Sequence, residues 1–178
     1  MDSRLQELLD RMEIQKLINI YCQGCDRFDA VRMAEPFHPD SIVDHGHISA
    51  TGAAFVNEAL PAQVEHTSMV WHQMGQALID VKGSEASAES YMFVAIRGSG
   101  ENDARMDLMG GRLIDHFVKE DGAWTIKTRL QIRDWSFSTR IEEDSLANAM
   151  FAQGLPNGAD PGLRALGRMH SGRLTLGD

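Results

Sequence analysis

Basic residues are scarce in this chain of 178 residues, where 17 Lys and Arg oppose 26 Asp and Glu and the net charge is −9. Proteins that bind nucleic acids need a basic surface to neutralise phosphates, and no local run of Lys or Arg supplies one here. The composition therefore argues against a nucleic-acid partner. We expect a small hydrophobic molecule instead, because a neutral organic ligand is not repelled by an acidic surface.

Long apolar runs are also absent. No stretch approaches the ~20 consecutive apolar residues that a helix needs to cross a bilayer. The first residues, Met1 to Arg4, lead directly into a charged amphipathic pattern and lack the apolar core of a signal peptide. We expect a cytoplasmic protein without membrane attachment.

Cysteine occurs only twice, at Cys22 and Cys25, which form a Cys-x-x-Cys pair. A thioredoxin-type motif places such a pair at the start of a helix, where the thiol pKa falls. Here the pair lies at the end of a helical pattern, so we interpret both residues as small buried thiols. No second Cys or His pair has the spacing of a zinc site, and no phosphate-binding glycine loop or Gly-x-Ser-x-Gly elbow occurs. We expect no metal and no cofactor.

The spacing of apolar residues changes along the chain from a helical to an extended period. Ser3 is the expected N-cap of the first helix, and Pro61 should end the third, because proline disrupts a helix interior. Asp121-Gly122 predicts a tight hairpin turn. The predicted helices cover 3–25, 29–37 and 52–60, and the predicted strands cover 41–46, 71–82, 85–97, 107–120 and 123–137.

The last predicted strand alternates most clearly between apolar and polar residues. The face toward the core would hold Trp124, Ile126, Thr128, Leu130 and Ile132. The face toward the solvent would hold Thr125, Lys127, Arg129, Gln131 and Arg133. Helices followed by an antiparallel meander indicate the α+β class. The pattern favours one α+β domain over 1–137 and a helical extension over 138–178. In that extension 142–153 is helical in pattern, and Asp160-Pro161 is typical of a helix start.

Several segments, taken in order, resemble SnoaL-like proteins of the nuclear transport factor two-like superfamily. They are Asp10–Ile18, Tyr21, Asp26–Asp29, His38–Ser41, Asp44–Gly46, His72–Val81, Gly110–Asp115, Asp121–Trp124 and Asp134-Trp135. The resemblance spans roughly 5–137. It implies a cone-shaped barrel, in which a curved and mostly antiparallel sheet packs with three N-terminal helices around an apolar cavity.

The same resemblance implies two kinds of function. Relatives include polyketide cyclases, scytalone dehydratase, bile-acid dehydratases, a dehydrochlorinase and ketosteroid isomerases. The small subunits of ring-hydroxylating dioxygenases share the fold without performing the chemistry. Fold alone therefore does not decide between an enzyme and a binding module.

The positions that match the catalytic pair of dehydratase-like relatives are Asp26 and His72. A neutral imidazole can take a proton near neutral pH, and a carboxylate on its other nitrogen stabilises the imidazolium that forms. Tyr21 precedes Asp26 by five residues, as in bile-acid dehydratase-like sequences, where the phenol can donate to a substrate oxygen. The simpler interpretation is a helix-capping Asp26, a hydrogen-bonded His72 and a core Tyr21.

Four further residues are candidates for contact with the substrate. His45 belongs to a His-x-His pair with His47, but no Glu follows at the spacing of a cupin metal site, so His45 is assigned to the cavity mouth. Arg112 and His116 lie on a predicted strand whose inner face the sequence leaves open. Met74 offers a flexible thioether for the cavity wall, although filling the core is the commoner use of methionine.

The resulting hypothesis is a cofactor-free lyase or isomerase of the dehydratase type, acting on a polyketide, steroid or aromatic metabolite. Asp26 and His72 would supply general acid–base catalysis in a closed cavity. The alternative is a non-catalytic ligand-binding or structural subunit. In either case we expect a homodimer or higher homo-oligomer, because relatives of this fold often associate through the outer face of the sheet.

Overall fold

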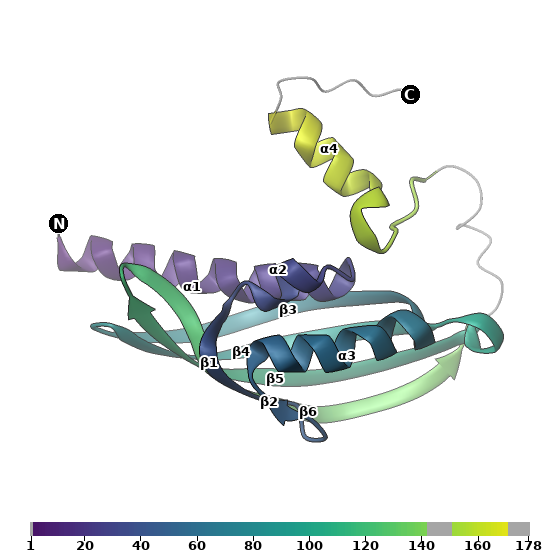
Figure 1. Cartoon of the computed structure of the whole chain (residues 1–178), viewed down its shortest axis with the longest axis horizontal. Coiled ribbons are helices and arrows are strands. Elements are labelled where there is room, and N and C mark those ends of the chain that lie inside the picture. Colours follow the sequence, from purple (N-terminus) through teal and green to yellow (C-terminus); the bar gives the residue numbers. More distant parts are fainter. Residues whose placement is uncertain (1, 142–150, 171–178) are drawn as a thin grey trace.

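The computed structural model describes residues 2–141 and 151–170. Three helices and six strands form the body of the molecule, and a short helix follows it (Figure 1). The helices are α1 (Ser3–Asp26), α2 (Ala30–Ala34), α3 (Gly52–His66) and α4 (Pro161–His170). The strands are β1 (Phe37–Asp44), β2 (Ser49–Ala50), β3 (Thr67–Lys82), β4 (Glu85–Gly98), β5 (Arg105–Glu120) and β6 (Ala123–Arg140).

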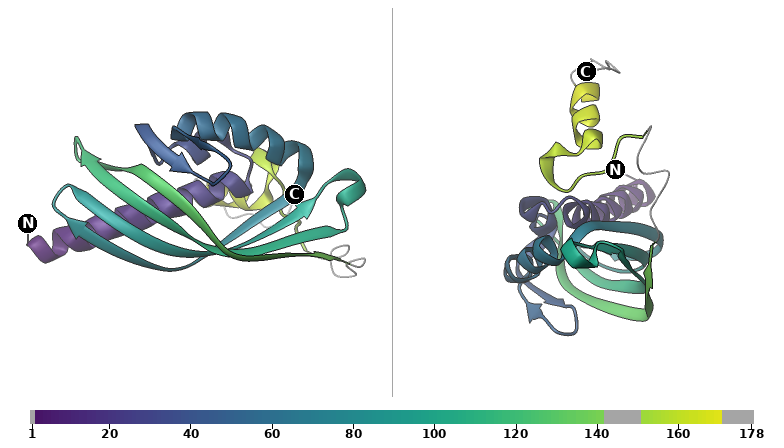
Figure 2. Two further views of the ribbon diagram at one scale, coloured as in Figure 1. Left: turned by 90° about the horizontal axis from the view of Figure 1, so that it is seen from below. Right: turned by 90° about the vertical axis from the view of Figure 1, so that its right-hand side faces the viewer.

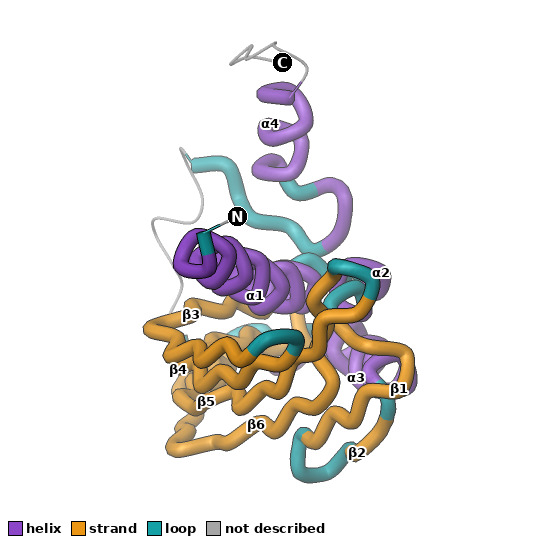
Figure 3. The backbone as a smooth tube through the Cα atoms, turned by 90° about the vertical axis from the view of Figure 1, so that its left-hand side faces the viewer, coloured by secondary structure: helices purple, strands orange, loops and turns teal. Residues whose placement is uncertain are grey.

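The six strands form one curved sheet in the order β2-β1-β6-β5-β4-β3. Only the β1–β6 pair is parallel, and the sheet does not close on itself. Helices α1, α2 and α3 cover its concave side, and no described element covers the convex side (Figures 2 and 3). The predicted α+β class, with a curved and mostly antiparallel sheet and three N-terminal helices, is confirmed.

The main core lies between the helices and the concave face of the sheet. Its fully buried members include Ile14 and Ile18 of α1 and Phe117 and Ile126 of the β5–β6 hairpin. Asp10 ties α1 to the same hairpin, because its carboxylate accepts hydrogen bonds from Lys119 Nζ at 2.6 Å and Trp124 Nε1 at 2.9 Å. Among the described residues, no helix combines the length and apolarity needed to cross a membrane.

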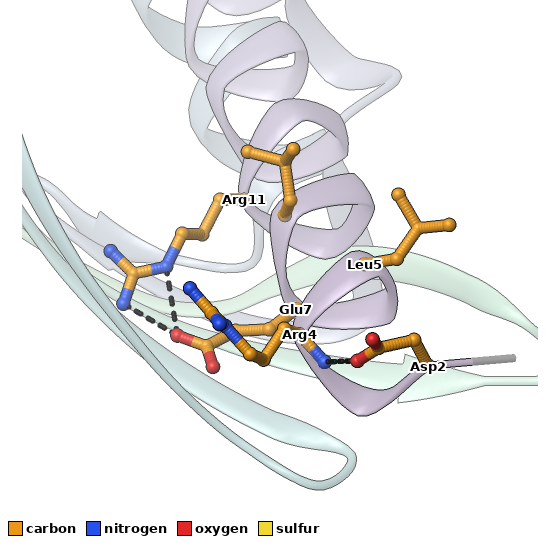
Figure 4. Close-up of a pocket in the computed structure, with 6 residues that line it drawn as sticks. Asp2, Arg4, Leu5, Glu7 and Arg11 are labelled. Carbon is orange, nitrogen blue, oxygen red and sulfur yellow. Dashed lines mark hydrogen bonds and ion pairs between the residues drawn. The ribbon is translucent and has the colours of Figure 1, made fainter.

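The predicted first helix is confirmed, but its N-cap differs from expectation. Asp2, not Ser3, caps the helix by accepting from the backbone N–H of Arg4. Leu5 is half exposed, because the first turns of α1 project past the end of the sheet (Figure 2). The first buried residue of the helix is Asp10. The shallow pocket at this helix end is bordered by Asp2, Arg4, Leu5, Glu7, Leu8 and Arg11, and an exposed Arg11–Glu7 ion pair lies beside it (Figure 4).

Two other helix boundaries were predicted wrongly. Helix α3 continues through Pro61 to His66, because the loss of one N–H is offset by packing against the sheet and by a cap in which Thr67 donates to the Gln63 carbonyl. Helix α2 covers only Ala30–Ala34, and Phe37 already belongs to β1. The Asp121-Gly122 hairpin is confirmed, with both residues at positive φ, 50° and 83°.

The predicted alternation of β6 holds only for its first half. Trp124 and Ile126 face the core, but Arg129 is then buried while Leu130 is 43% exposed. The pairing of His116 with Thr128 and of Phe117 with Ile126 leaves Lys127 as an extra residue. This β-bulge reverses the two faces of the strand beyond it. Arg129, Gln131 and Arg133 were therefore assigned to the wrong face.

The reversal places an ion pair inside the protein. Arg129 and Asp115 both have fully buried side chains and share two hydrogen bonds, at 2.7 and 2.8 Å. The guanidinium also lies over the ring of Tyr21, 4.3 Å from its centroid. Burial opposes the charge on Arg129, but Asp115 outweighs it, so the pKa of the guanidinium rises above its ordinary value.

Beyond β6 the described chain resumes at 151, so most of the predicted helix over 142–153 lies outside the described residues, and 151–153 are not helical. The second predicted helix start is confirmed. Asp160 caps α4 by accepting from the backbone N–H groups of Gly162 and Leu163. Its buried carboxylate also lies 3.5 Å from Arg27 Nε, which joins this segment to the end of α1.

We predict that Asp115→Asn lowers the free energy of unfolding by about 3–5 kcal/mol, because it leaves the buried charge of Arg129 without a counter-ion. Urea denaturation followed by circular dichroism measures the effect. Glu7→Ala is the control, since it breaks an exposed ion pair and should cost less than about 1 kcal/mol. Equal losses in the two variants would contradict the buried pair.

Candidate active site

The C-terminal residue of α1 meets the third strand through a carboxylate–imidazole contact. Asp26 Oδ1 lies 2.6 Å from His72 Nδ1, and both side chains are 12% exposed. The backbone N–H of His72 also donates to the two Asp26 oxygens, at 3.1 and 3.2 Å. Because an ionised carboxylate only accepts hydrogen bonds, Nδ1 is the donor and Nε2 of the neutral ring keeps its lone pair.

Local packing at the end of α1 holds Asp26 over the sheet. A Cβ on Gly24 would lie 2.4 Å from the backbone nitrogen of Met33, so only glycine lets α1 and α2 approach this closely. The chain then turns at Phe28, whose φ is 52°. Gln63 of α3 donates to the Cys25 carbonyl at 2.7 Å, which anchors α3 to the same helix end.

A pocket of about 490 Å³ opens beside His72, between the helices and the concave face of the sheet. Three of the predicted site residues, Tyr21, His45 and His72, contribute to its wall. The other lining residues are mainly apolar: Cys25, Met33, His47, Ile48, Phe55, Glu58, Ala59, Ala62, Gln63, Thr67, Val70, Val94, Ile96, Met109, Gln131 and Arg133.

Tyr21 is held as a neutral phenol at the inner side of this pocket. It is 4% exposed, and burial raises its pKa well above the ordinary value, although the positive charge of Arg129 acts in the opposite direction. Its hydroxyl lies 3.5 Å from His45 Nε2. The hydroxyl therefore remains a hydrogen-bond donor across the neutral pH range.

His45 is the second titratable group of the pocket wall that burial holds in its neutral form. Burial, reinforced by the charge of Arg129, lowers its pKa to about 3. The ring packs against Phe55, with centroids 4.3 Å apart. Two of the three imidazoles that line the pocket thus have different surroundings, because His72 has a carboxylate partner and His45 has a phenol and an aromatic ring.

The two cysteines are free and buried, as predicted. Burial raises the pKa of Cys22 to about 12 and raises that of Cys25 further. Both are therefore protonated near neutral pH. A protonated buried thiol is a poor nucleophile and a poor metal ligand, which argues against redox chemistry at this pair.

The sheet does not bring the other predicted residues to the pocket. Leu113 and Asp115 are buried on the inner face of β5, so the alternating Arg112 and His116 lie on the outer face. Arg112 there binds Glu89 and Asp134, and His116 lies near Glu85. Met74 packs between the two hydrophobic clusters of the core and does not line the pocket.

Sequence reasoning missed the contributions of α3 and of the second half of β6. Phe55, Glu58 and Gln63 line the pocket from α3, and Gln131 and Arg133 line it from β6. The helical pattern of α3 was visible but gave no sign of which face meets the pocket. The β6 residues were hidden by the bulge at Lys127. Among the described residues, no group of three His, Cys, Asp or Glu side chains could hold a metal ion.

A curved sheet covered by helices on one side, with a ligand-sized pocket between the two layers, defines a class of small α+β proteins. The chain belongs to the SnoaL-like domain family, whose model matches residues 6–130. The resemblance noted in the sequence is thereby confirmed. No curated protein matches the chain.

Solved structures share this fold at low sequence identity. A provisionally named scytalone dehydratase from Novosphingobium aromaticivorans is 20% identical with a TM-score of 0.66, over 86% of this chain and 95% of that one. The hexachlorocyclohexane dehydrochlorinase LinA-type3 from Novosphingobium barchaimii is 16% identical with a TM-score of 0.68, over 85% and 99%. A provisionally named aromatic ring hydroxylase from N. aromaticivorans is 20% identical with a TM-score of 0.67, over 74% and 94%.

We predict that His45 does not titrate between about pH 5 and pH 8, because burial lowers its pKa to about 3. Because the pKa of this imidazole is 6.5 in the unfolded chain and about 3 in the folded chain, lowering the pH from about 6.5 toward 3 favours unfolding. NMR titration of the ring carbon-bound protons tests the first point. A His45 midpoint near 6.5 would contradict the burial argument.

Proposed function

We propose that this chain is a cofactor-free lyase or isomerase of the dehydratase type, acting on an apolar, ring-bearing metabolite such as a polyketide, a steroid or an aromatic compound. The observation that carries the proposal is the 2.6 Å contact between Asp26 and His72 beside the pocket. An imidazole base that a carboxylate orients can remove a proton from carbon.

In the proposed reaction, His72 Nε2 removes a proton from a carbon next to a carbonyl group. The imidazolium that forms is stabilised by Asp26, and the electron pair of the broken C–H bond moves to the carbonyl oxygen. The Tyr21 phenol donates a hydrogen bond to that oxygen. In an elimination, the carbonyl re-forms, a C=C bond forms next to it and the bond to the β-hydroxyl breaks, while the imidazolium gives its proton to that hydroxyl, which departs as water. In an isomerisation, the carbonyl re-forms, the C=C bond shifts and the imidazolium gives its proton to another carbon.

The pocket supports the assignment of substrate class. Its volume of about 490 Å³ lies within the ~300–1,000 Å³ typical of small-molecule sites. Most of the lining side chains are aliphatic or aromatic, which favours an apolar ring system. The names of the scytalone dehydratase and dehydrochlorinase neighbours also support an elimination, although this argument comes from those proteins and not from this chain.

We predict that His72→Ala lowers kcat by about 10²–10⁴-fold, the usual contribution of general acid–base catalysis, and leaves the fold intact. Asp26→Asn should cost less, because the base remains but its orientation and its counter-charge are lost. The measurement is the ultraviolet absorbance of the conjugated product from a panel of cyclic β-hydroxy ketones. His116→Ala is the matched control, since this histidine lies on the outer face.

Unchanged turnover in His72→Ala would refute the proposed role of His72. If the wild-type protein binds ring compounds but turns over none of the panel, the results would favour the alternative, a non-catalytic binding subunit. Thermal unfolding by circular dichroism confirms in parallel that each variant is folded.

We also propose that the convex face of the sheet binds a second copy of the chain. Trp71, Phe93, Trp135 and Phe137 form a continuous strip there, with successive ring centroids 6.3, 5.9 and 6.1 Å apart. Trp71, Trp135 and Phe137 are each about half exposed. An exposed apolar strip of this kind is typical of a protein–protein contact, and it carries no charge that would add to the repulsion between two chains of charge −9.

The expected result is a dimer or larger oligomer in light scattering that Trp135→Glu converts to monomers. Leu166→Glu, which places a charge on an exposed leucine of α4, should leave the mass unchanged. A monomeric wild-type protein at high micromolar concentration would contradict the proposal.

A further inference from the structure

The wall of the pocket carries a guanidinium group without a protein partner. Arg133 and Gln131 occupy alternate positions on the inner side of β6, and both line the pocket. Among the pocket-lining residues that the structure describes, Arg133 is the only one with a permanent positive charge. Within residues 2–141 and 151–170, its side chain makes no hydrogen bond and no ion pair.

The neighbouring arginines of the sheet are paired. Arg129, four residues earlier on β6, makes two hydrogen bonds to Asp115. Arg112, on the outer face, binds Glu89 at 2.9 Å and Asp134 at 2.9 and 3.0 Å. Arg112 and Arg129, which lie outside the pocket, thus have carboxylate partners. Arg133 is an exposed residue that lines the pocket, and its guanidinium is open to a ligand.

The guanidinium of Arg133, which has no protein partner among the described residues, favours a planar anion as its ligand. Its rigid fork of N–H donors matches the two oxygens of a carboxylate and can bind both at once. The Gln131 amide lies two positions away on the same face and can donate to the same group. Glu58 of α3 is the acidic residue among the described lining residues, and it forms no ion pair with Arg133.

The position of Arg133 relative to His72 indicates the shape of the ligand. His72 lies on β3 and Arg133 on β6, with β4 and β5 between them. Three strand spacings amount to about 14 Å along the curved sheet, and less across its concave side. A molecule held at both points needs a rigid apolar body between the reacting carbon and its anionic end.

We propose that the substrate of this pocket carries a carboxylate, which Arg133 and Gln131 hold at the β6 wall while the ring system extends toward His72. The inference rests on the proposed function, and it departs from the expectation of a neutral ligand drawn from the net charge. One localised cation suffices for this selectivity, because the charge of the whole surface does not decide a contact made within a few ångströms.

The test compares two probes of nearly equal shape, 2-naphthoate and 2-naphthamide, by isothermal titration calorimetry near neutral pH. The wild-type protein should bind 2-naphthoate about tenfold more tightly than 2-naphthamide, the usual advantage of a charge-assisted hydrogen-bonded pair. Arg133→Met should remove this preference by weakening 2-naphthoate alone, and Arg133→Lys should restore part of it. Glu58→Gln should strengthen 2-naphthoate binding, because it removes a negative charge from the pocket wall.

Arg112→Met is the matched control, since it removes a guanidinium from the outer face and should keep the preference. Equal affinity for the two probes in the wild type, a preference that survives in Arg133→Met, or no saturable binding of 2-naphthoate would each overturn the proposal. His72→Ala should keep the preference for 2-naphthoate over 2-naphthamide. Its turnover therefore reports on the proposed reaction, whereas the probe preference reports on Arg133.

Discussion

The contact between Asp26 and His72 joins two parts of the chain that are 46 positions apart, and the interpretation of the pocket depends on it. The carboxylate receives both the ring and the backbone N–H of the same histidine, so one residue determines the position and the tautomer of the other. That arrangement needs the end of α1 to be held in place. The close approach at Gly24 and the bond from Gln63 to the Cys25 carbonyl meet this need.

Around this contact, burial gives neighbouring polar groups different protonation states. Tyr21 stays a phenol and His45 stays a neutral imidazole, while Arg129 keeps its charge because Asp115 lies against it. The interior thus holds one stable charge pair beside two neutral hydrogen-bonding groups. The neutral groups of such a pocket can donate hydrogen bonds to a developing oxyanion. They do so without placing an unpaired positive charge next to the base.

The curved sheet separates the pocket from the surface proposed for association. Its concave face holds the pocket and the buried ion pair, and its convex face exposes the aromatic strip from Trp71 to Phe137. The bulge at Lys127 determines which β6 side chains belong to which face. Without it, Arg133 would lie outside and Leu130 inside, and the pocket would lose the only permanently positive residue among the described residues of its wall.

The sequence alone determined the order of the elements, the Asp121-Gly122 hairpin and, through the family resemblance, the pairing of Asp26 with His72. These features follow from local periodicity, turn chemistry and motif order, which short windows of sequence contain. Only the tertiary structure decided the face on which Arg129, Gln131 and Arg133 lie, the passage of α3 through Pro61, and the exposure of Leu5. Each of these features depends on what packs against the segment. The pairing with β5 shifts the register of β6, and the sheet supports the end of α3 but does not cover the start of α1. A local sequence pattern contains no information about either effect.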